Sequence, residues 1–503
     1  MVRSGSEPFL RPPSFTYLVP VSLTLLANRA PVRRTEDGWA AALGGLATAL
    51  LPVLEQRGGA WVAMGAPDEG APERQPFPEE VPRFTIHRVP LSEAEVEGYY
   101  DGMANRVLWP ITHYLIEHTE PHRLFSGTYR AVNERFARAA LEAAGPGDLF
   151  WVHDYHLMLV PALLRRACPE AAVGHFWHVP WPAPEVFRIL PTARSLLAGL
   201  LGADLVGFHT EGYAENFRES ARDLLGARVE GEAVLWQGRR VRAEAHPIGI
   251  DVGYFGALGA DAETGREARA LREGLDVERL VVAVDRLDYT KGLLLRLDAF
   301  ERFLRTHPEQ RGRVSLLQVA TPSRTGIESY DQLKREVDEA VGRINGAFAE
   351  GQWVPIHYRY RAYPQEELAV LYRAADVALI TPLRDGMNLV AHEFAATSQP
   401  DRPAVVVLSE LTGSADYLDG AVLVNPYDTE GLPEALREAL AMPLEERRRR
   451  LSRLKAAVRR LDVHAWAGRF LAALHPAGER ADAPSPGGDG HTVSVPRLAS
   501  VAP

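Results

Sequence analysis

The chain has 503 residues, of which 46% are hydrophobic, and this length exceeds what a single hydrophobic core usually supports, so two domains are expected. Its formal net charge of −10 argues against a nucleic-acid-binding protein, whose contact surface would be basic. The one cysteine, Cys168, excludes an internal disulfide and a four-cysteine zinc site, and it fits a reducing cytoplasm.

The first 14 residues are polar and contain proline, so we expect them to be disordered. The apolar run 15–27 superficially resembles a signal peptide. We interpret it instead as the first strand, because it leads directly into a motif around Arg29 that has the character of a binding site, and we expect a loop at 33–38 after it. No apolar run approaches the ~20 residues needed to cross a bilayer, so no membrane partner is expected.

Gly44 and Gly45 open a predicted helix over 47–56. A glycine pair at a helix N-terminus can hold a phosphate or diphosphate, although close helix packing explains the pair equally well. After predicted strands at 61–64 and 84–89, a helix beginning at Ser92 carries Tyr100 and Trp109. These two aromatic residues are nine positions apart, so they are not expected to share one face of an α-helix.

Polar residues follow the next predicted strands. The strand 148–153 ends in His153-Asp154-Tyr155-His156, and the strand 172–177 is followed by His178-Val179-Pro180-Trp181-Pro182. The first motif allows a metal site, but no further ligand cluster is evident, and an acid at a strand end fits hydroxyl binding better. Another strand ends near Thr210. The alternation of strands and helices predicts a parallel sheet covered by helices on both faces.

The pattern pauses at 245–251, where we place the domain boundary. The second half restarts with the strand 280–285, followed by Arg286 and Lys291, which could neutralise a diphosphate leaving group. The alternative is that Arg286 and Lys291 belong to a solvated, charged face of the protein. Further strands are predicted at 314–319, 354–360, 377–380, 404–408 and 421–424, and Arg324 and Tyr363 each follow one of them.

The stretch Thr381–Glu393 connects a buried strand to a helix. In a parallel sheet, ligands bind at such crossovers, outside the carboxyl ends of the strands. Gly386 would allow close backbone approach, and the free N–H groups near Asn388, Leu389 and Val390 would face an anion. Asp385 could accept hydrogen bonds from sugar hydroxyls, and Glu393 could reach a diol. The alternative is an ordinary strand-to-helix turn with a helix cap.

Two helices are predicted at 443–460 and from 463 to about 474, and the proline- and glycine-rich residues 476–503 are expected to be disordered. The chain contains no phosphate loop of the G-x-x-x-x-G-K-[ST] type and no G-x-G-x-x-G fingerprint. It also contains no D-x-D pair, which argues against a metal-dependent glycosyltransferase of the GT-A type.

Several of these motifs resemble those of the trehalose-6-phosphate synthases, which are retaining glucosyltransferases of glycosyltransferase family 20. The resemblance covers roughly 22–475 and is carried by 153–156, 178–182, 285–292, 343–345 and 381–393. It implies an α/β fold of the GT-B type, with two Rossmann-like, doubly wound parallel-sheet domains facing across a cleft. The domains would span 15–247 and 248–461, and a helix over 462–475 would return to the N-terminal domain.

The resemblance also implies roles for individual residues. The sugar-phosphate acceptor would contact Arg29, Tyr100, Trp109, Asp154 and Arg324. The nucleoside-diphosphate glucose would contact Gly44, Gly45, His178, Arg286, Lys291, Tyr363, Asp385, Gly386, Met387, Asn388, Leu389, Val390 and Glu393. The reaction itself would depend on His178, Asp154, Arg286, Lys291 and Asp385.

The implied reaction transfers glucose from UDP-glucose or GDP-glucose to glucose 6-phosphate, giving trehalose 6-phosphate with retention at the anomeric carbon. No covalent nucleophile, metal or cofactor is expected, the location would be cytoplasmic, and a homo-oligomer is compatible with the composition. Three alternatives stay open. They are a glucosylglycerol-phosphate synthase using glycerol 3-phosphate, a pseudo-glycosyltransferase joining cyclitols, and a catalytically silent sugar-phosphate sensor.

Overall fold

The computed structural model describes residues 23–35, 38–41, 50–51, 53–54, 58–65, 84–120, 122–145, 147–324 and 327–474. The predictions for residues 1–14, for the glycine pair Gly44 and Gly45 and for the tail 476–503 lie outside the described residues. None of the described helices is long and apolar enough to cross a membrane.

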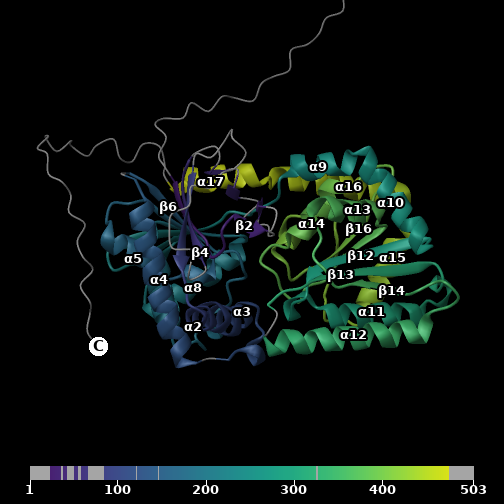
Figure 1. Cartoon of the computed structure of the whole chain (residues 1–503), viewed down its shortest axis with the longest axis horizontal. Helices are drawn as coiled ribbons and strands as arrows, with labels where there is room; N and C mark the ends of the chain where they lie inside the picture. The colour runs from purple at the N-terminus through teal and green to yellow at the C-terminus, as the bar shows by residue number, and fades with distance from the viewer. Residues whose placement is uncertain are drawn as a thin grey trace, which may run out of the picture.

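The N-terminal half is built on a nine-stranded sheet (Figure 1). Its strands, from edge to edge, are β5 (Phe84–Pro90), β4 (Gly59–Gly65), β1 (Leu23–Leu26), β6 (Leu149–His153), β7 (Val173–Phe176), β8 (Leu205–Phe208), β11 (Arg239–Ala245), β10 (Ala233–Trp236) and β9 (Arg228–Glu230). The strands from β5 to β11 run parallel, and β10 and β9 add an antiparallel edge. The central strands β1, β6, β7 and β8 are buried throughout, as expected for a parallel sheet with covered faces.

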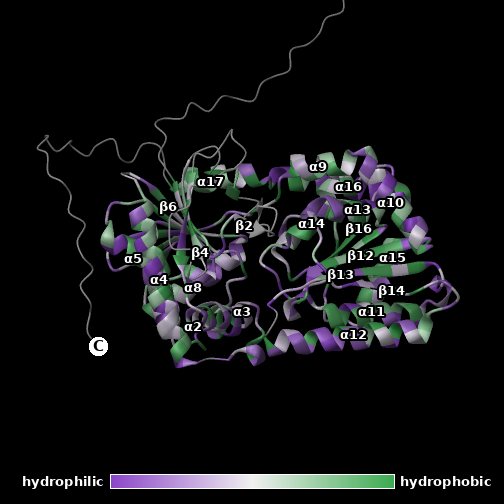
Figure 2. Ribbon diagram, viewed as in Figure 1, coloured by the Kyte–Doolittle hydropathy of each residue, from purple (hydrophilic) through white to green (hydrophobic). Residues whose placement is uncertain are grey.

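The C-terminal half contains a six-stranded, wholly parallel sheet. Its order is β14 (Ile356–Arg359), β13 (Val314–Thr321), β12 (Arg279–Arg286), β15 (Val377–Ile380), β16 (Val405–Ser409) and β17 (Val422–Val424). Figure 2 shows hydrophobic residues concentrated on these strands, while the surrounding helices present mixed faces. The two sheets with their helices confirm the predicted fold of two parallel-sheet α/β domains.

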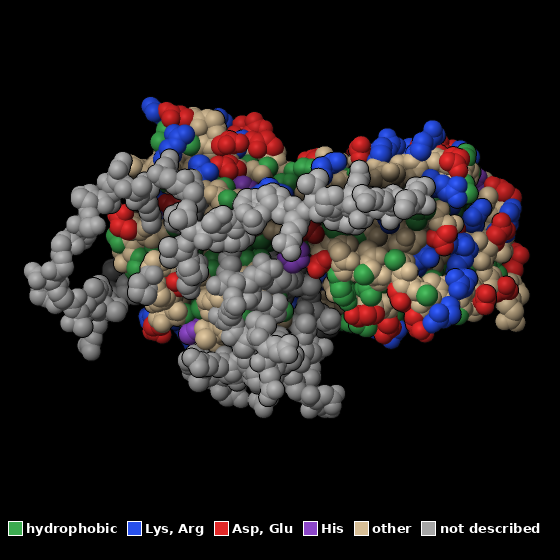
Figure 3. All heavy atoms as spheres, turned by 90° about the horizontal axis from the view of Figure 1, so that it is seen from above, with side chains coloured by type: hydrophobic (Ala, Val, Ile, Leu, Met, Phe, Trp, Pro, Cys, Tyr) green, Lys and Arg blue, Asp and Glu red, His purple; other side chains and the backbone are tan. Residues whose placement is uncertain are grey.

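Helices cover both sheets. In the N-terminal half they are α2 (Glu93–Val96), η1 (Glu97–Leu108), α3 (Trp109–Thr112), α4 (Arg123–Ala143), α5 (Val160–Ala167), α6 (Pro184–Phe187), α7 (Ala193–Leu200) and α8 (Glu211–Leu225). In the C-terminal half they are α9 (Val252–Ala260), α10 (Ala262–Leu275), α11 (Leu293–Thr306), α12 (Glu328–Phe348), α13 (Gln365–Ala374), α14 (Leu389–Thr397), α15 (Gly431–Ala441) and α16 (Leu444–Arg460). On the face seen in Figure 3, acidic and basic side chains are interspersed over the described part of the C-terminal half.

The last helix, α17 (Val463–Leu474), returns to the N-terminal half, as the sequence predicts (Figure 1). Trp466 and Phe470 enter the core beside the N-terminal sheet, with ring centroids 5.2 Å and 4.9 Å from Trp151. Phe176 packs edge-on against both rings. This apolar contact fixes the returning helix, because burial of large aromatic surfaces is the main source of packing energy.

Two predicted local structures differ from the observed ones. The loop expected at 33–38 belongs to a two-stranded antiparallel ribbon of β2 (Val32–Thr35) and β3 (Gly38–Ala41). The helix after Ser92 forms, but its middle part η1 is a π-helix of 12 residues. A π-helix has roughly 4.4 residues per turn, so positions nine apart complete about two turns. The expectation that Tyr100 and Trp109 point to different sides is therefore wrong.

Candidate active site

The loop between β15 and α14 has the backbone geometry of a binding segment. Asn388 adopts φ 70°, its side-chain oxygen accepts from the Ala391 amide, and its side-chain nitrogen donates to Asp385 at 3.1 Å. A Cβ on Gly386 would lie 2.2 Å from the carbonyl oxygen of His178. Only glycine therefore lets this loop of the C-terminal domain approach the segment after β7 in the N-terminal domain.

Lys291 and Asp385 form an ion pair at the centre of this region. The Lys291 Nζ lies 2.5 Å from Asp385 Oδ2, and the two side chains are 9% and 17% exposed. Burial alone would raise the pKa of Asp385, but the charge of Lys291 outweighs it, so the pKa is lowered and the carboxylate is anionic at neutral pH. Lys291 follows β12 and Asp385 follows β15, and these strands are neighbours.

A second group of predicted residues gathers beside the first. Arg29 donates a 2.8 Å hydrogen bond to the Tyr100 hydroxyl, and the Tyr100 ring stacks on His156. The Arg324 guanidinium lies 4.0 Å from the centroid of the Trp109 ring, and that of Arg286 lies 5.3 Å from the same centroid. The wider turn of η1 brings Tyr100 and Trp109 to this one side. Residues predicted to bind the acceptor thus come together from both domains.

Asp154 and His178 lie between the two groups. Asp154 has φ 70° and ψ 174°, a strained conformation that non-glycine residues rarely adopt outside functional sites. Its Oδ1 accepts from the backbone N–H of His178 at 3.3 Å. Burial raises the pKa of Asp154 to about 7 and keeps the His178 imidazole neutral by lowering its pKa. His153 hydrogen-bonds His178 at 3.0 Å, and within the described part of the chain no group of three or more His, Cys, Asp or Glu side chains is placed to hold a metal ion.

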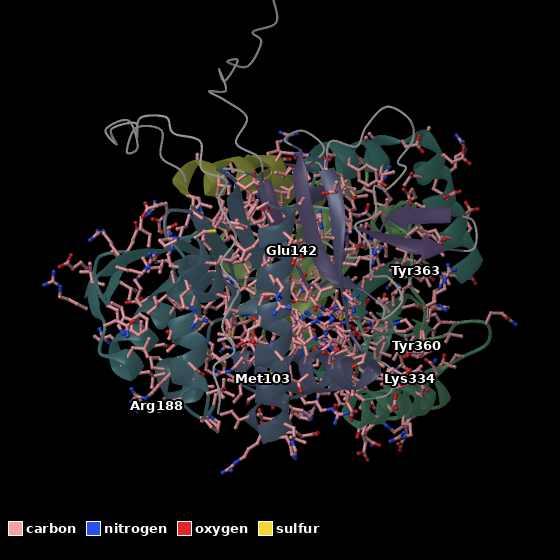
Figure 4. All side chains as sticks on the ribbon, turned by 60° about the vertical axis from the view of Figure 1, so that its left-hand side comes forward. Met103, Glu142, Arg188, Lys334, Tyr360 and Tyr363 are labelled. Atoms are coloured by element: carbon pink, nitrogen blue, oxygen red, sulfur yellow. The ribbon has the colours of Figure 1, made fainter. Side chains whose placement is uncertain are left out.

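The remaining predicted donor residues that the structure describes lie on the C-terminal half. Glu393 accepts from the Tyr372 hydroxyl at 2.7 Å, and burial raises its pKa to about 7. Tyr363 is buried, with the Arg361 guanidinium 3.9 Å from its ring centroid. In Figure 4 the labelled residues Tyr363 and Tyr360 both lie on the C-terminal half. Met387 is buried, while Leu389 and Val390 form the first turn of α14.

The sequence did not reveal every residue that shapes this site. Asp288 accepts hydrogen bonds from Trp109 and Arg324. Its position two residues after Arg286 is the feature of the sequence that could have indicated a role in the site. Tyr155, next to Asp154, accepts a 3.4 Å hydrogen bond from Arg324. Tyr213 donates to the Asp385 carbonyl at 3.1 Å across the two domains, and no local pattern indicates this contact.

The comparison with known proteins agrees with this geometry. The family model described as glycosyltransferase family 20 matches residues 19–476. The chain belongs to glycosyltransferase family 20. The resemblance seen in its sequence motifs is therefore confirmed.

Individual relatives share most of the chain. It is 40% identical over 461 residues to a trehalose-6-phosphate synthase of Sinorhizobium fredii, covering 91% of this chain and 99% of the relative. It is 45% identical to a bifunctional trehalose-6-phosphate synthase/phosphatase of Thermoproteus tenax, covering 90% of this chain but 63% of that relative. A crystal structure of a UDP-forming alpha,alpha-trehalose-phosphate synthase from Burkholderia xenovorans in complex with glucose-6-phosphate matches with a TM-score of 0.83 at 36% identity, covering 90% of this chain and 99% of that one.

Proposed function

We propose that the chain transfers glucose from a nucleoside-diphosphate glucose to glucose 6-phosphate, forming trehalose 6-phosphate. The observation that carries the proposal is the meeting of four cationic residues in one site, with Arg324 and Arg286 at the Trp109 ring, Arg29 beside Tyr100 and Lys291 beside Asp385. Their combined charge suits two phosphorylated substrates. The relatives of family 20 that bear the synthase name, one of them crystallised with glucose-6-phosphate, support the same reaction.

The acceptor binds on the side of η1. Arg29 and Arg324 hold its phosphate, and Tyr100 and Trp109 flank its sugar ring. Arg324 is fixed against Trp109 at 4.0 Å, which orients its charge before substrate arrives. Asp154 accepts a hydrogen bond from an acceptor hydroxyl when its carboxyl group is ionised.

The donor binds on the side of α14. The N–H groups of Leu389 and Val390 at the start of this helix face the diphosphate, where the helix dipole favours negative charge. Asp385 and His178 orient the glucose, and Glu393 binds the ribose diol. Tyr363 borders the base, and the diphosphate contact predicted from the sequence for Gly44 and Gly45 lies outside the described residues.

Retention follows from a reaction on one face of the sugar. The bond from the anomeric carbon to the β-phosphate oxygen breaks, the bond to the acceptor oxygen forms, and a β-phosphate oxygen takes the acceptor proton. Lys291 and Arg286 stabilise the charge that develops on the leaving diphosphate. Asp385 is held by Lys291 and Asn388, so it acts by orientation and not as a nucleophile.

We also propose that the reaction needs no metal or cofactor, because these two cations supply the charge that a divalent ion would otherwise provide. A cytoplasmic location is part of the proposal, and the single cysteine supports it. A homo-oligomer remains compatible with it.

Incubation of the purified protein with each donor and each acceptor tests the proposal. The donors are UDP-glucose and GDP-glucose, the acceptors are glucose 6-phosphate and glycerol 3-phosphate, and a chelator replaces added metal. We expect a product with the mass of trehalose 6-phosphate. If a product forms with glycerol 3-phosphate and not with glucose 6-phosphate, glycerol 3-phosphate is the acceptor. Saturable binding of the substrates without any product would overturn the enzymatic function.

A further inference from the structure

Asp288 is a fully buried carboxylate, 0% exposed, between the two halves of the acceptor site. It follows β12 and heads the short 3-10 turn that ends at Lys291. Its Oδ1 accepts from Trp109 Nε1 at 3.4 Å and from the backbone N–H and hydroxyl of Thr290 at 3.0 Å and 2.8 Å. Its Oδ2 accepts from Arg324 Nη1 at 2.9 Å and from the Tyr330 hydroxyl at 3.3 Å.

Every one of these five contacts brings a donor to Asp288. A carboxylate is the side-chain group that accepts on both oxygens and donates on neither. An asparagine of the same shape would turn N–H groups toward one set of these donors and leave them unpaired. Burial opposes ionisation, but Arg324, Arg286 and Lys291 outweigh it, so the pKa of Asp288 is held well below its usual range. The carboxylate is therefore anionic throughout the working pH range.

The contact with Asp288 determines which edge of Arg324 is free. Its Nη1 is occupied by Asp288 and by the Tyr330 hydroxyl, and its face lies on Trp109. Its Nε is buried and has no hydrogen-bond partner among the described residues, while its Nη2 makes one long contact of 3.4 Å with Tyr155. The edge formed by Nε and Nη2 is the one that binds two oxygens of a phosphate in a bidentate pair.

We propose that Asp288 is a positioning residue that presents the free edge of Arg324 to the phosphate of the acceptor and holds the Trp109 ring beside the acceptor's sugar. One oxygen holds the indole from the N-terminal domain and the other holds the guanidinium from the C-terminal domain. The carboxylate does not touch the phosphate, which would repel it. The inference rests on the proposed function, because it takes the acceptor to be a sugar phosphate.

The direct test is Asp288→Asn, with steady-state kinetics for both substrates. We expect the KM for glucose 6-phosphate to rise about 10- to 100-fold, the loss typical when the partner that orients a binding group is removed. The KM for the nucleotide sugar should change less than about threefold, because Arg286, which is assigned to the donor, lies 3.8 Å from Asp288 Oδ2, beyond hydrogen-bond distance. In the Arg324→Ala background the same substitution should add almost nothing, because a residue that acts through Arg324 has nothing left to position.

Asp376→Asn is the matched control. Asp376 is also a buried carboxylate of the C-terminal domain, which accepts from Arg272, Arg402 and the Leu280 amide at the amino ends of the strands. It should lower the apparent Tm while leaving the KM for glucose 6-phosphate within about twofold. If Asp288→Asn does not fold, Tyr330→Phe removes one donor to Asp288 and one contact of Arg324, and should raise the same KM severalfold.

Three results would overturn the inference. They are an unchanged KM for glucose 6-phosphate, equal losses for both substrates, and effects of the Asp288 and Arg324 substitutions that add fully. Failure of the proposed function would look different, because the wild-type protein itself would then form no product.

Discussion

Replacing Lys291 with alanine separates two roles of one side chain. In the structure the ammonium group neutralises the carboxylate of Asp385 at 2.5 Å, with little exposure of either group. In the proposed reaction it would stabilise the leaving diphosphate. The substitution removes both effects, and it leaves Asp385 with the Asn388 amide as its other side-chain partner among the described residues.

The structural cost follows from the orphaned charge. Breaking a buried ion pair by removing one partner costs about 3–5 kcal/mol, most of it from the unpaired charge that remains. Asp385 is 17% exposed, so we expect the lower end, about 3 kcal/mol. The catalytic cost is of similar size but has another origin. Loss of one group that stabilises developing negative charge lowers kcat by about 10²–10³, equivalent to about 2.7–4 kcal/mol.

The double variant Lys291→Ala with Asp385→Asn distinguishes the two costs. It removes the orphaned charge, so the apparent Tm should return most of the way to the wild-type value. Turnover should stay low, because the Lys291 ammonium group is missing and Arg286 is the one assigned cation left to stabilise the diphosphate. Calorimetry and steady-state kinetics on the wild type, the single variants Lys291→Ala and Asp385→Asn, and the double variant measure both quantities.

Lys334→Ala is the control for loss of a lysine. Lys334 pairs with Asp338 one turn along α12, where the two side chains are 27% and 48% exposed, and its Nζ lies 4.6 Å from the centroid of the Tyr360 ring. A helix pair of this kind contributes about 0.3–0.5 kcal/mol and an exposed cation–π contact about 0.5–1 kcal/mol, so the loss of stability should be much smaller than for Lys291→Ala and kcat should stay near wild type. The reasoning fails if Lys291→Ala keeps the wild-type kcat/KM, or if Asp385→Asn restores turnover along with stability.

Three further outcomes are expected. Arg324→Ala should raise the KM for glucose 6-phosphate with little change for the donor; a rise for the donor alone would contradict its assignment to the acceptor. Because burial raises the pKa of Asp154 to about 7, its anionic fraction falls as the pH drops, so kcat/KM for the acceptor should decline below about pH 7, and Asp154→Asn should remove that part of the pH profile together with most activity. If the decline below about pH 7 persists in Asp154→Asn, a group other than Asp154 causes it. Gly386→Ala should lower kcat and raise the donor KM, since the new Cβ would lie 2.2 Å from the His178 carbonyl oxygen, and a variant with wild-type kinetics would show that this approach is not needed.

The sequence predicted best those elements whose signal is local and strong. The strand over 377–380 and the helix over 463–474 occur as expected, because a short apolar run and an amphipathic repeat leave few alternatives. The edge strands β9 and β10 were not predicted, since β9 is mostly exposed and the pair is short. The prediction applied the α-helical period to the segment that forms the π-helix η1, and the predicted direction of Trp109 was wrong for that reason.

In the candidate site too, the residues with a local signal were predicted and those that depend on distant contacts were not. The loop from Thr381 carries its own signal, because its acid, amide and glycine are close in sequence, whereas the contacts of Asp288 join segments around 109, 290, 324 and 330. Convergence of this kind depends on the tertiary fold, so no single motif could predict it. The roles given to the site residues stay predictions until variants are measured.

The anomeric configuration of the product is the sharpest test of glucose transfer with retention to glucose 6-phosphate. The wild-type protein would be incubated with ¹³C-labelled UDP-glucose or GDP-glucose and glucose 6-phosphate, without metal, and the product examined by NMR. The account predicts that the transferred glucose keeps the α configuration and is joined through the anomeric carbon of glucose 6-phosphate. A β-configured product, or release of labelled free glucose with no disaccharide phosphate, would contradict it.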